Sequence, residues 1–101
     1  AFVVSLSSGV YAAILNVPSI LYPTIQSAIN AATNGDTVLV QPGTYQETID
    51  FLGKEITVES SGGASVTTID ANQLDTVVYF WNGETSDTVL EGFTLTGGIG
   101  Y

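Results

Sequence analysis

The carboxylates are the residues of this chain with the clearest capacity for chemistry. Ten Asp and Glu accompany a single Lys, Lys54, and the chain has no Arg, His or Cys. Acids on stacked strands about 4.8 Å apart can bind Ca²⁺ through their oxygens, and four acids follow one another closely: Glu47, Asp50, Glu55 and Glu59. Because such separate acids are more often solvated outward positions, we expect no metal site and no cofactor.

The run Tyr79-Phe80-Trp81 is the second set of residues with a chemical interpretation. Aromatic rings stack on sugar rings. Alternation along a strand places Tyr79 and Trp81 on one side and Phe80 on the other. Tyr79 and Trp81 are therefore candidate carbohydrate contacts, although core or interface packing is the more frequent role of such residues.

Most other chemistries lack the residues they need. Without His, no Ser has the base that a nucleophilic triad requires, and zinc would have to be held by carboxylates alone. The stretch Gly97-Gly98-Ile99-Gly100 lacks the Lys and the strand–loop–helix context of a phosphate-binding loop. We therefore expect no catalytic residues in this chain.

The net charge argues against polyanionic partners. The formal charge is −9 at pH 7 and the isoelectric point is about 4.1, so Lys54 alone cannot neutralise the phosphates of nucleic acid or of an anionic membrane surface. An acidic surface suits a secreted protein, a high-salt setting or a cation-binding face, and it also simply favours solubility. We expect no nucleic acid and no membrane among the partners.

The elements that position these residues are mostly β. The chain is 45% hydrophobic and only 11% charged, with eleven Gly, which favours strands and turns. One segment, residues 22–35, is predicted to be helical: Pro23 suits its first turn and Asn34-Gly35 its end. Its apolar face has helical spacing and consists of Ile25, Ala28, Ile29 and Ala32. Asp36, after Gly35, is placed to cap the turn into the next strand.

Short β-rich runs separated by turn residues make up the rest of the chain. Their spacing of about ten residues fits a sandwich or barrel as well as a solenoid. The runs are apolar or Thr-rich at both odd and even positions, which favours a parallel solenoid. We expect strands at 37–40, 45–51, 56–59, 66–69, 76–81, 88–91 and 93–96. Residues 1–101 then form a single domain, with one or two strands in 1–21, the helix in 22–35 and the coils in 36–101.

Three stretches resemble the first segment and first coils of the pectate lyase-like superfamily. They are Tyr22-Pro23-Thr24-Ile25-Gln26-Ser27-Ala28-Ile29, Gly35-Asp36-Thr37-Val38-Leu39-Val40-Gln41-Pro42-Gly43-Thr44-Tyr45-Gln46-Glu47 and Val89-Leu90-Glu91-Gly92-Phe93-Thr94-Leu95-Thr96-Gly97-Gly98. The resemblance runs from Val17 to about Tyr101 and leaves Ala1 to Asn16 outside. It implies an all-β, short right-handed parallel β-helix whose mouth is covered by an N-terminal α-helical cap. Gly43 would form a tight corner after Pro42.

The enzymes of that superfamily use residues that this chain does not combine. The resemblance implies calcium with an Arg or Lys base for lyases, an Asp pair with an Arg on later coils for methylesterases, and clustered carboxylates for hydrolases. The chain has no Arg, and its acids are spread along the sequence. Lys54 lies in a Gly-Lys-Glu turn where family members carry it without catalysis. We expect that the chain is not an enzyme.

Three functions remain open. The first is a non-catalytic β-helix module, secreted or at the cell surface, with a structural or interaction role. The second is the N-terminal fragment of a larger secreted polysaccharide-active β-helix protein, and the third is a small carbohydrate-binding protein that uses Tyr79 and Trp81. Nothing after residues 93–96 resembles a second cap, so we expect an uncovered last coil that pairs two copies into a homodimer. The residues expected at that contact are Phe93, Leu95, Ile99 and Tyr101.

Overall fold

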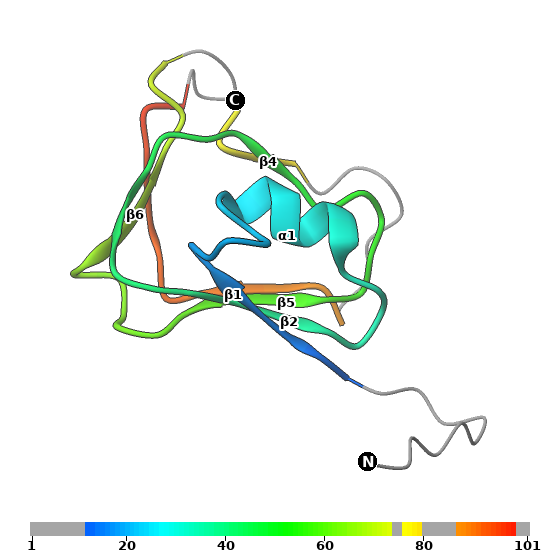
Figure 1. Ribbon diagram of the computed structural model, residues 1–101. Coiled ribbons are helices and arrows are strands. Elements are labelled where there is room, and N and C mark those ends of the chain that lie inside the picture. The colour runs from blue at the N-terminus through cyan, green and yellow to red at the C-terminus, as the bar shows by residue number, and fades with distance from the viewer. Residues whose placement is uncertain (1–11, 74–75, 80–86, 99–101) are drawn as a thin grey trace, which may run out of the picture.

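The chain winds as a parallel β-solenoid of about three turns. The structure is a computed structural model, and it describes residues 12–73, 76–79 and 87–98. Viewed along the axis of the solenoid, the chain follows a triangular outline (Figure 1). Each side of the triangle is one sheet, and every strand pairing in the described residues is parallel. The predicted parallel, mostly β architecture is confirmed.

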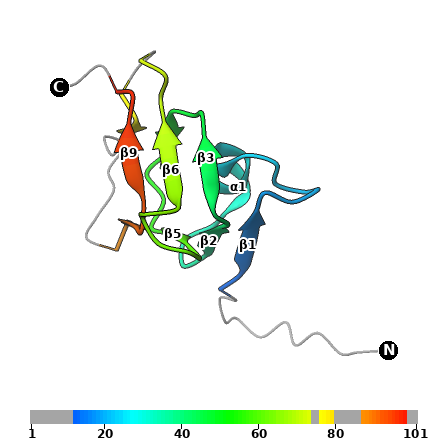
Figure 2. The ribbon, with the colours of Figure 1, turned by 90° about the vertical axis from the view of Figure 1, so that its left-hand side faces the viewer.

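The strands of each sheet stack along the solenoid axis (Figure 2). The four-stranded sheet has the order β1 (Ile14–Val17), β2 (Thr37–Val40), β5 (Thr57–Ser60) and β8 (Val89–Glu91). The three-stranded sheet has the order β3 (Gly43–Tyr45), β6 (Thr67–Asp70) and β9 (Thr94–Thr96), and the two-stranded sheet pairs β4 (Ile49–Asp50) with β7 (Val78–Tyr79).

One of the predicted strands is divided in the structure. The run at 45–51 was expected to be one strand, but it contains the end of β3, a corner and then β4. The corner is needed because the chain must turn from one side of the triangle to the next. Gly43 stands where the chain turns from β2 into β3, with a φ of +152°, as the predicted corner requires. Of the strands expected in residues 1–21, β1 is the one in the described part.

Aliphatic side chains at alternate strand positions point inward and stack from coil to coil. Val38 of β2 is in register with Val58 of β5, and both are fully buried. Leu15 of β1 stacks on Val38 and is buried as well. Burial of each such side chain contributes about 1.5–3 kcal/mol. The core is completed by Ile49, Phe51, Ile56 and Ile69, which are fully buried.

Successive coils differ in length although their strands stay in register. Thr57 pairs with Thr37, 20 residues earlier, whereas Val89 pairs with Thr57, 32 residues earlier. The additional residues lie between strands, because β3 starts six residues after β2 starts, while β6 starts ten residues after β5 starts. The stacking of the strands is therefore independent of the lengths of the corners.

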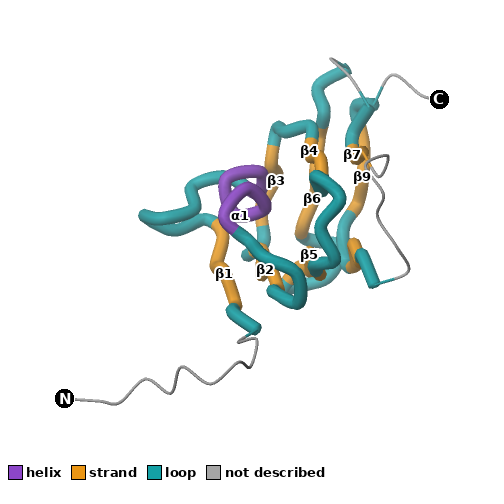
Figure 3. The backbone as a smooth tube through the Cα atoms, turned by 90° about the vertical axis from the view of Figure 1, so that its right-hand side faces the viewer, coloured by secondary structure: helices purple, strands orange, loops and turns teal. Residues whose placement is uncertain are grey.

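Helix α1 (Ile25–Ala31) lies inside the triangular outline, at the end of the stack where β1 and β3 lie (Figure 1 and Figure 3). Its N-cap is Thr24: the Thr24 hydroxyl accepts from Ser27 N, and Ser27 Oγ accepts from Thr24 N, both at 3.1 Å. The predicted apolar face is confirmed, since Ile25, Ala28, Ile29 and Ala32 are all buried.

The predicted ends of the helix were wrong. Pro23 precedes the N-cap instead of starting the helix, and Ala32 already has an extended backbone, with φ −68° and ψ 152°. The helix therefore stops before Asn34-Gly35, because the chain must leave the interior to begin β2. No helix in the described ranges has the length and apolarity needed to cross a membrane.

Candidate functional site

Glu47, expected as a solvated acid, binds the N-terminus of α1. Glu47 Oε2 accepts from Ile25 N at 2.9 Å, and Glu47 Oε1 accepts from Gln26 N at 3.0 Å. The first amides of a helix have no partner within the helix, and the N-terminus carries a partial positive charge, so a carboxylate is favourable there. Glu47 comes from the segment between β3 and β4, and it fixes the start of α1 on the first coil.

Lys54 binds the other end of the same helix. Its ammonium donates to Ile29 O at 2.7 Å and to Asn30 O at 2.9 Å. These carbonyls lie at the C-terminal end of α1, where the helix carries partial negative charge. The only cationic side chain of the sequence is thus held by backbone carbonyls of the helix, and Glu47 and Lys54 hold the two ends of α1.

Asp36 joins the segment after α1 to β1. It is 5% exposed, and its Oδ1 accepts from Ala13 N at 2.8 Å. Its Oδ2 accepts from Thr33 N at 2.9 Å and from Thr33 Oγ1 at 3.2 Å. The hydrogen bond from the Thr33 backbone, followed by that from Ala13, lowers the pKa of Asp36 although burial opposes this. The predicted capping role of Asp36 in the turn before β2 is confirmed.

The other acids of the first set do not gather around one point. Asp50 lies in β4, and its Oδ1 accepts from Leu52 N at 2.8 Å. Glu59 lies in β5 of a different sheet, in register with Glu91 of β8. Across the described ranges, no group of three or more carboxylates is placed to hold a metal ion.

One of the two candidate sugar-binding aromatics can be located. Tyr79 ends β7, in register with Asp50 of the neighbouring strand β4, and its side chain is partly exposed. Ile49 is buried, so alternation places Asp50 and Tyr79 outward. A carboxylate beside an aromatic ring is an arrangement that can contact a sugar. Trp81 lies outside the described residues.

At the end of the described solenoid opposite α1, the coil that contains β8 and β9 has exposed apolar side chains at inward positions. Leu95 of β9 is 46% exposed, whereas its register partner Ile69 of β6 is fully buried. Leu90 of β8 is partly exposed, whereas its partner Val58 is fully buried. Phe93 packs against the core and is also only partly buried. We call Leu90, Phe93 and Leu95 the C-terminal face. The other two expected contacts, Ile99 and Tyr101, lie outside the described residues.

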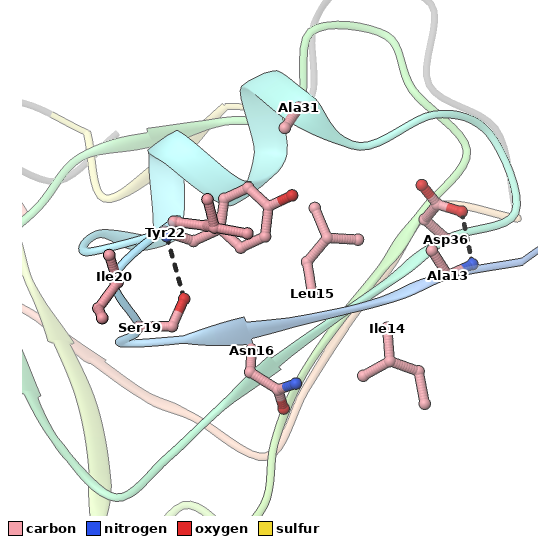
Figure 4. Close-up of a pocket in the computed structure, with 10 residues that line it drawn as sticks. Ala13, Ile14, Leu15, Asn16, Ser19, Ile20, Tyr22, Ala31 and Asp36 are labelled. Atoms are coloured by element: carbon pink, nitrogen blue, oxygen red, sulfur yellow. Dashed lines mark hydrogen bonds between the residues drawn. The ribbon is translucent and has the colours of Figure 1, made fainter. Parts of the chain in front are cut away.

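The end of the solenoid that carries α1 contains a groove that sequence reasoning missed. It has a volume of about 730 Å³ and lies between β1, the turn at residues 18–22 and α1 (Figure 4). Leu15 points into it and Asp36 stands at one end (Figure 4). We call it the β1 groove; its apolar lining comes from Ile14, Leu15, Ile20, Leu21, Tyr22 and Ala31. The adjacent apolar residues Ile20 and Leu21, beside Pro18-Ser19, were the available signal in the sequence.

No protein-family model, no curated protein and no solved structure matches this chain.

Proposed function

We propose that this chain is a non-catalytic module with a structural or interaction role, and that it pairs with a second copy through the C-terminal face. One observation carries the proposal: Leu95 is exposed at a position that is fully buried one coil earlier, at Ile69. Apolar side chains and strand edges uncovered together are a surface for association. A second copy that meets this face about a two-fold axis buries both faces at once and closes the assembly.

Sedimentation of the 101-residue chain at micromolar concentration tests the pairing. We expect a mass of twice 10.5 kDa, and a monomer for Leu95→Asp. Leu52→Asp is the matched control, because Leu52 is 44% exposed, Leu95 is 46% exposed, and Leu52 lies away from the C-terminal face. The net charge of −9 opposes pairing, so raising the salt concentration strengthens the wild-type dimer. A wild-type monomer that stays folded on dilution contradicts the proposal.

We infer further that α1 is an N-terminal cap, and that the solenoid is a right-handed β-helix of the pectate lyase-like kind. The burial of Ile25 and Ile29 against β1, β2 and β4 supports the cap, as does the clamp by Glu47 and Lys54. Ile29→Asp places an unpaired charge in the core and should cause aggregation or loss of folding. Ala31→Asp on the exposed side of the same helix should leave the chain soluble and folded. If the Ile29→Asp variant is soluble and as stable as the wild type, the proposal that α1 is a cap is contradicted.

The absence of enzyme activity is part of the same proposal. It is supported by the roles of Glu47, Asp36 and Lys54, whose charged groups bind backbone atoms of α1 and its neighbours. Incubation of the chain with pectin, alginate or xylan should release no reducing sugars or unsaturated products. Cleavage that disappears in Asp50→Asn would overturn this part. A secreted or cell-surface location fits the acidic surface and is tested by fractionation of the source cells.

Carbohydrate binding is the second candidate function. The register of Tyr79 with Asp50 on the outside of the two-stranded sheet favours it. Titration with oligosaccharides, followed by the fluorescence of Trp81, tests it. Saturable quenching that Tyr79→Ala weakens would favour a carbohydrate-binding protein, or a piece of a larger polysaccharide-active protein, over a purely structural module.

A further inference from the structure

One edge of strand β1, beside the β1 groove, pairs with no strand in the described residues, and we call it the open edge. Strand β1 is the end strand of its sheet, and its only strand neighbour among the described elements is β2. The carbonyls of Ala13 and Val17 accept from Thr37 N and Gln41 N. Residues of a parallel strand direct their backbone groups alternately to the two sides. The N–H and C=O of Ile14 and Asn16 are therefore directed to the open edge.

The apolar part of the β1 groove is presented by a turn with a fixed shape. Ser19 N donates to Tyr22 O at 2.9 Å, and Tyr22 N donates to Ser19 Oγ at 3.0 Å. Between these residues Ile20 is fully exposed and Leu21 is 77% exposed. Ile14, on the nearby strand, is also exposed. Exposed aliphatic side chains beside a strand edge that no described strand covers favour the binding of another chain.

The charge at one end of the β1 groove indicates which kind of partner segment would bind there. Asp36 lines one end of the β1 groove and also lines a polar depression of about 380 Å³ together with Glu55 and Asp87. The single Lys of the chain is held at the C-terminus of α1. Lys54 also attracts Asp36, but three carboxylates against one ammonium leave this end of the groove negative. A second copy, with a net charge of −9, is repelled there, whereas a basic segment is attracted.

We propose that the β1 groove binds an extended segment of a partner protein that has apolar side chains at alternate positions and a Lys or Arg at the end beside Asp36. The segment adds a strand to the open edge of β1 and hydrogen-bonds the backbones of Ile14 and Asn16. Its apolar side chains pack on Ile20 and Leu21, and its cation lies near the carboxylates. The site is separate from the C-terminal face, so it does not rest on the pairing of two copies.

A labelled peptide with the sequence Lys-Thr-Val-Thr-Val-Thr is the probe, and the full chain is the receptor. Fluorescence anisotropy should show saturable binding that weakens as salt is added. Replacing the Lys of the peptide with Glu should weaken binding about tenfold at low salt, and N-methylation of alternate peptide amides should abolish it. In hydrogen exchange, the bound peptide should protect the amides of Ile14 and Asn16.

Variants of the chain separate the proposed site from other occupants. Ile20→Glu and Leu21→Glu, both at exposed positions, should weaken binding of the probe about tenfold, and Leu52→Glu should leave it unchanged. Absence of saturable binding, or binding that Ile20→Glu does not alter, overturns the proposal. An oligomer of the chain alone that Ile20→Glu dissociates would place a second copy in the groove, which also overturns it.

Discussion

The side-chain amide of Gln26 pairs with the backbone of Asp50 as a neighbouring strand would. Asp50 N donates to Gln26 Oε1 at 2.7 Å, and Gln26 Nε2 donates to Asp50 O at 3.0 Å. Asp50 belongs to β4, whose only strand partner in the described part is β7, so one edge of β4 faces α1. Backbone groups left unpaired in the protein interior cost free energy, and Gln26 removes that cost by completing the edge of β4.

Gln26→Glu tests this pairing with almost no change in shape. A carboxylate cannot donate to Asp50 O, and it adds a negative charge close to Glu47, which binds the adjacent amides. We expect the free energy of unfolding, measured in urea, to fall by about 1–3 kcal/mol. Asn30→Asp adds the same charge on the same helix and keeps an oxygen that accepts from Gln26 Nε2. Equal stability of the two variants would show that the edge of β4 does not need Gln26.

Lys54→Met removes the cation from the C-terminus of α1. The carbonyls of Ile29 and Asn30 lose their donor, and the helix loses the favourable charge at its end. We expect a loss of about 1–2 kcal/mol in the free energy of unfolding, seen as a lower melting temperature. Lys54→Arg keeps both the charge and the donors, so it should melt closer to the wild type. If Lys54→Met and Lys54→Arg have the same melting temperature, the contacts of Lys54 with the end of α1 contribute nothing to stability.

Asp36 should make the stability of the chain depend on pH in the acidic range. Its pKa is lowered in the folded chain from the ordinary value of 3.8, so the unfolded chain takes up this proton at a higher pH than the folded chain does. The stabilisation is therefore complete above pH 3.8 and is lost as the pH falls through the folded-state pKa. The stability difference between wild type and Asp36→Asn, from urea unfolding, should shrink across that range. Glu59→Gln controls for net charge, and a difference that stays constant with pH would contradict the assignment.

Thr67→Val should stabilise the chain. Thr67 is fully buried in β6, and its Oγ1 is the one buried side-chain polar atom without a hydrogen-bond partner among the described residues. Valine has the same shape and no hydroxyl to desolvate, so we expect a gain of about 1 kcal/mol in the free energy of unfolding. Thr68→Val, at the neighbouring outward position, should have little effect on the melting temperature. A lower melting temperature for Thr67→Val would mean that the hydroxyl has a partner in solution.

Local periodicity was sufficient to predict the parts of the fold that depend on neighbouring residues. The spacing of Ile25, Ala28 and Ile29 predicted the buried face of α1, and the Val-rich run at 37–40 predicted β2. Apolar residues on both parities predicted parallel stacking, which the registers of β2, β5 and β8 confirm. Each of these patterns spans only a few residues, so the residues that determine it all lie within one segment of the sequence.

The partners of the charged and amide side chains could not be predicted in the same way. Gln26 and Asp50 are 24 residues apart, and Lys54 reaches a carbonyl 25 residues earlier. Such contacts depend on how one coil lies over the helix, which no short-range pattern records. The ends of α1 were mispredicted for a related reason: the path from α1 into β2 ends the helix at Ala31, before any residue that favours a stop. The β1 groove was missed because three separate segments form it.

The unequal coils have a consequence for how this protein can change. The step from Thr57 to Val89 is twelve residues longer than the step from Thr37 to Thr57, yet the strands keep their partners. Longer connections between β5 and β6, β6 and β7, and β7 and β8 all contribute to the difference. Each corner can therefore accept inserted sequence while the sheets stay aligned, since loop closure costs rise only slowly with length. The solenoid is a scaffold on which new surface loops can be acquired, or grafted by design, one corner at a time.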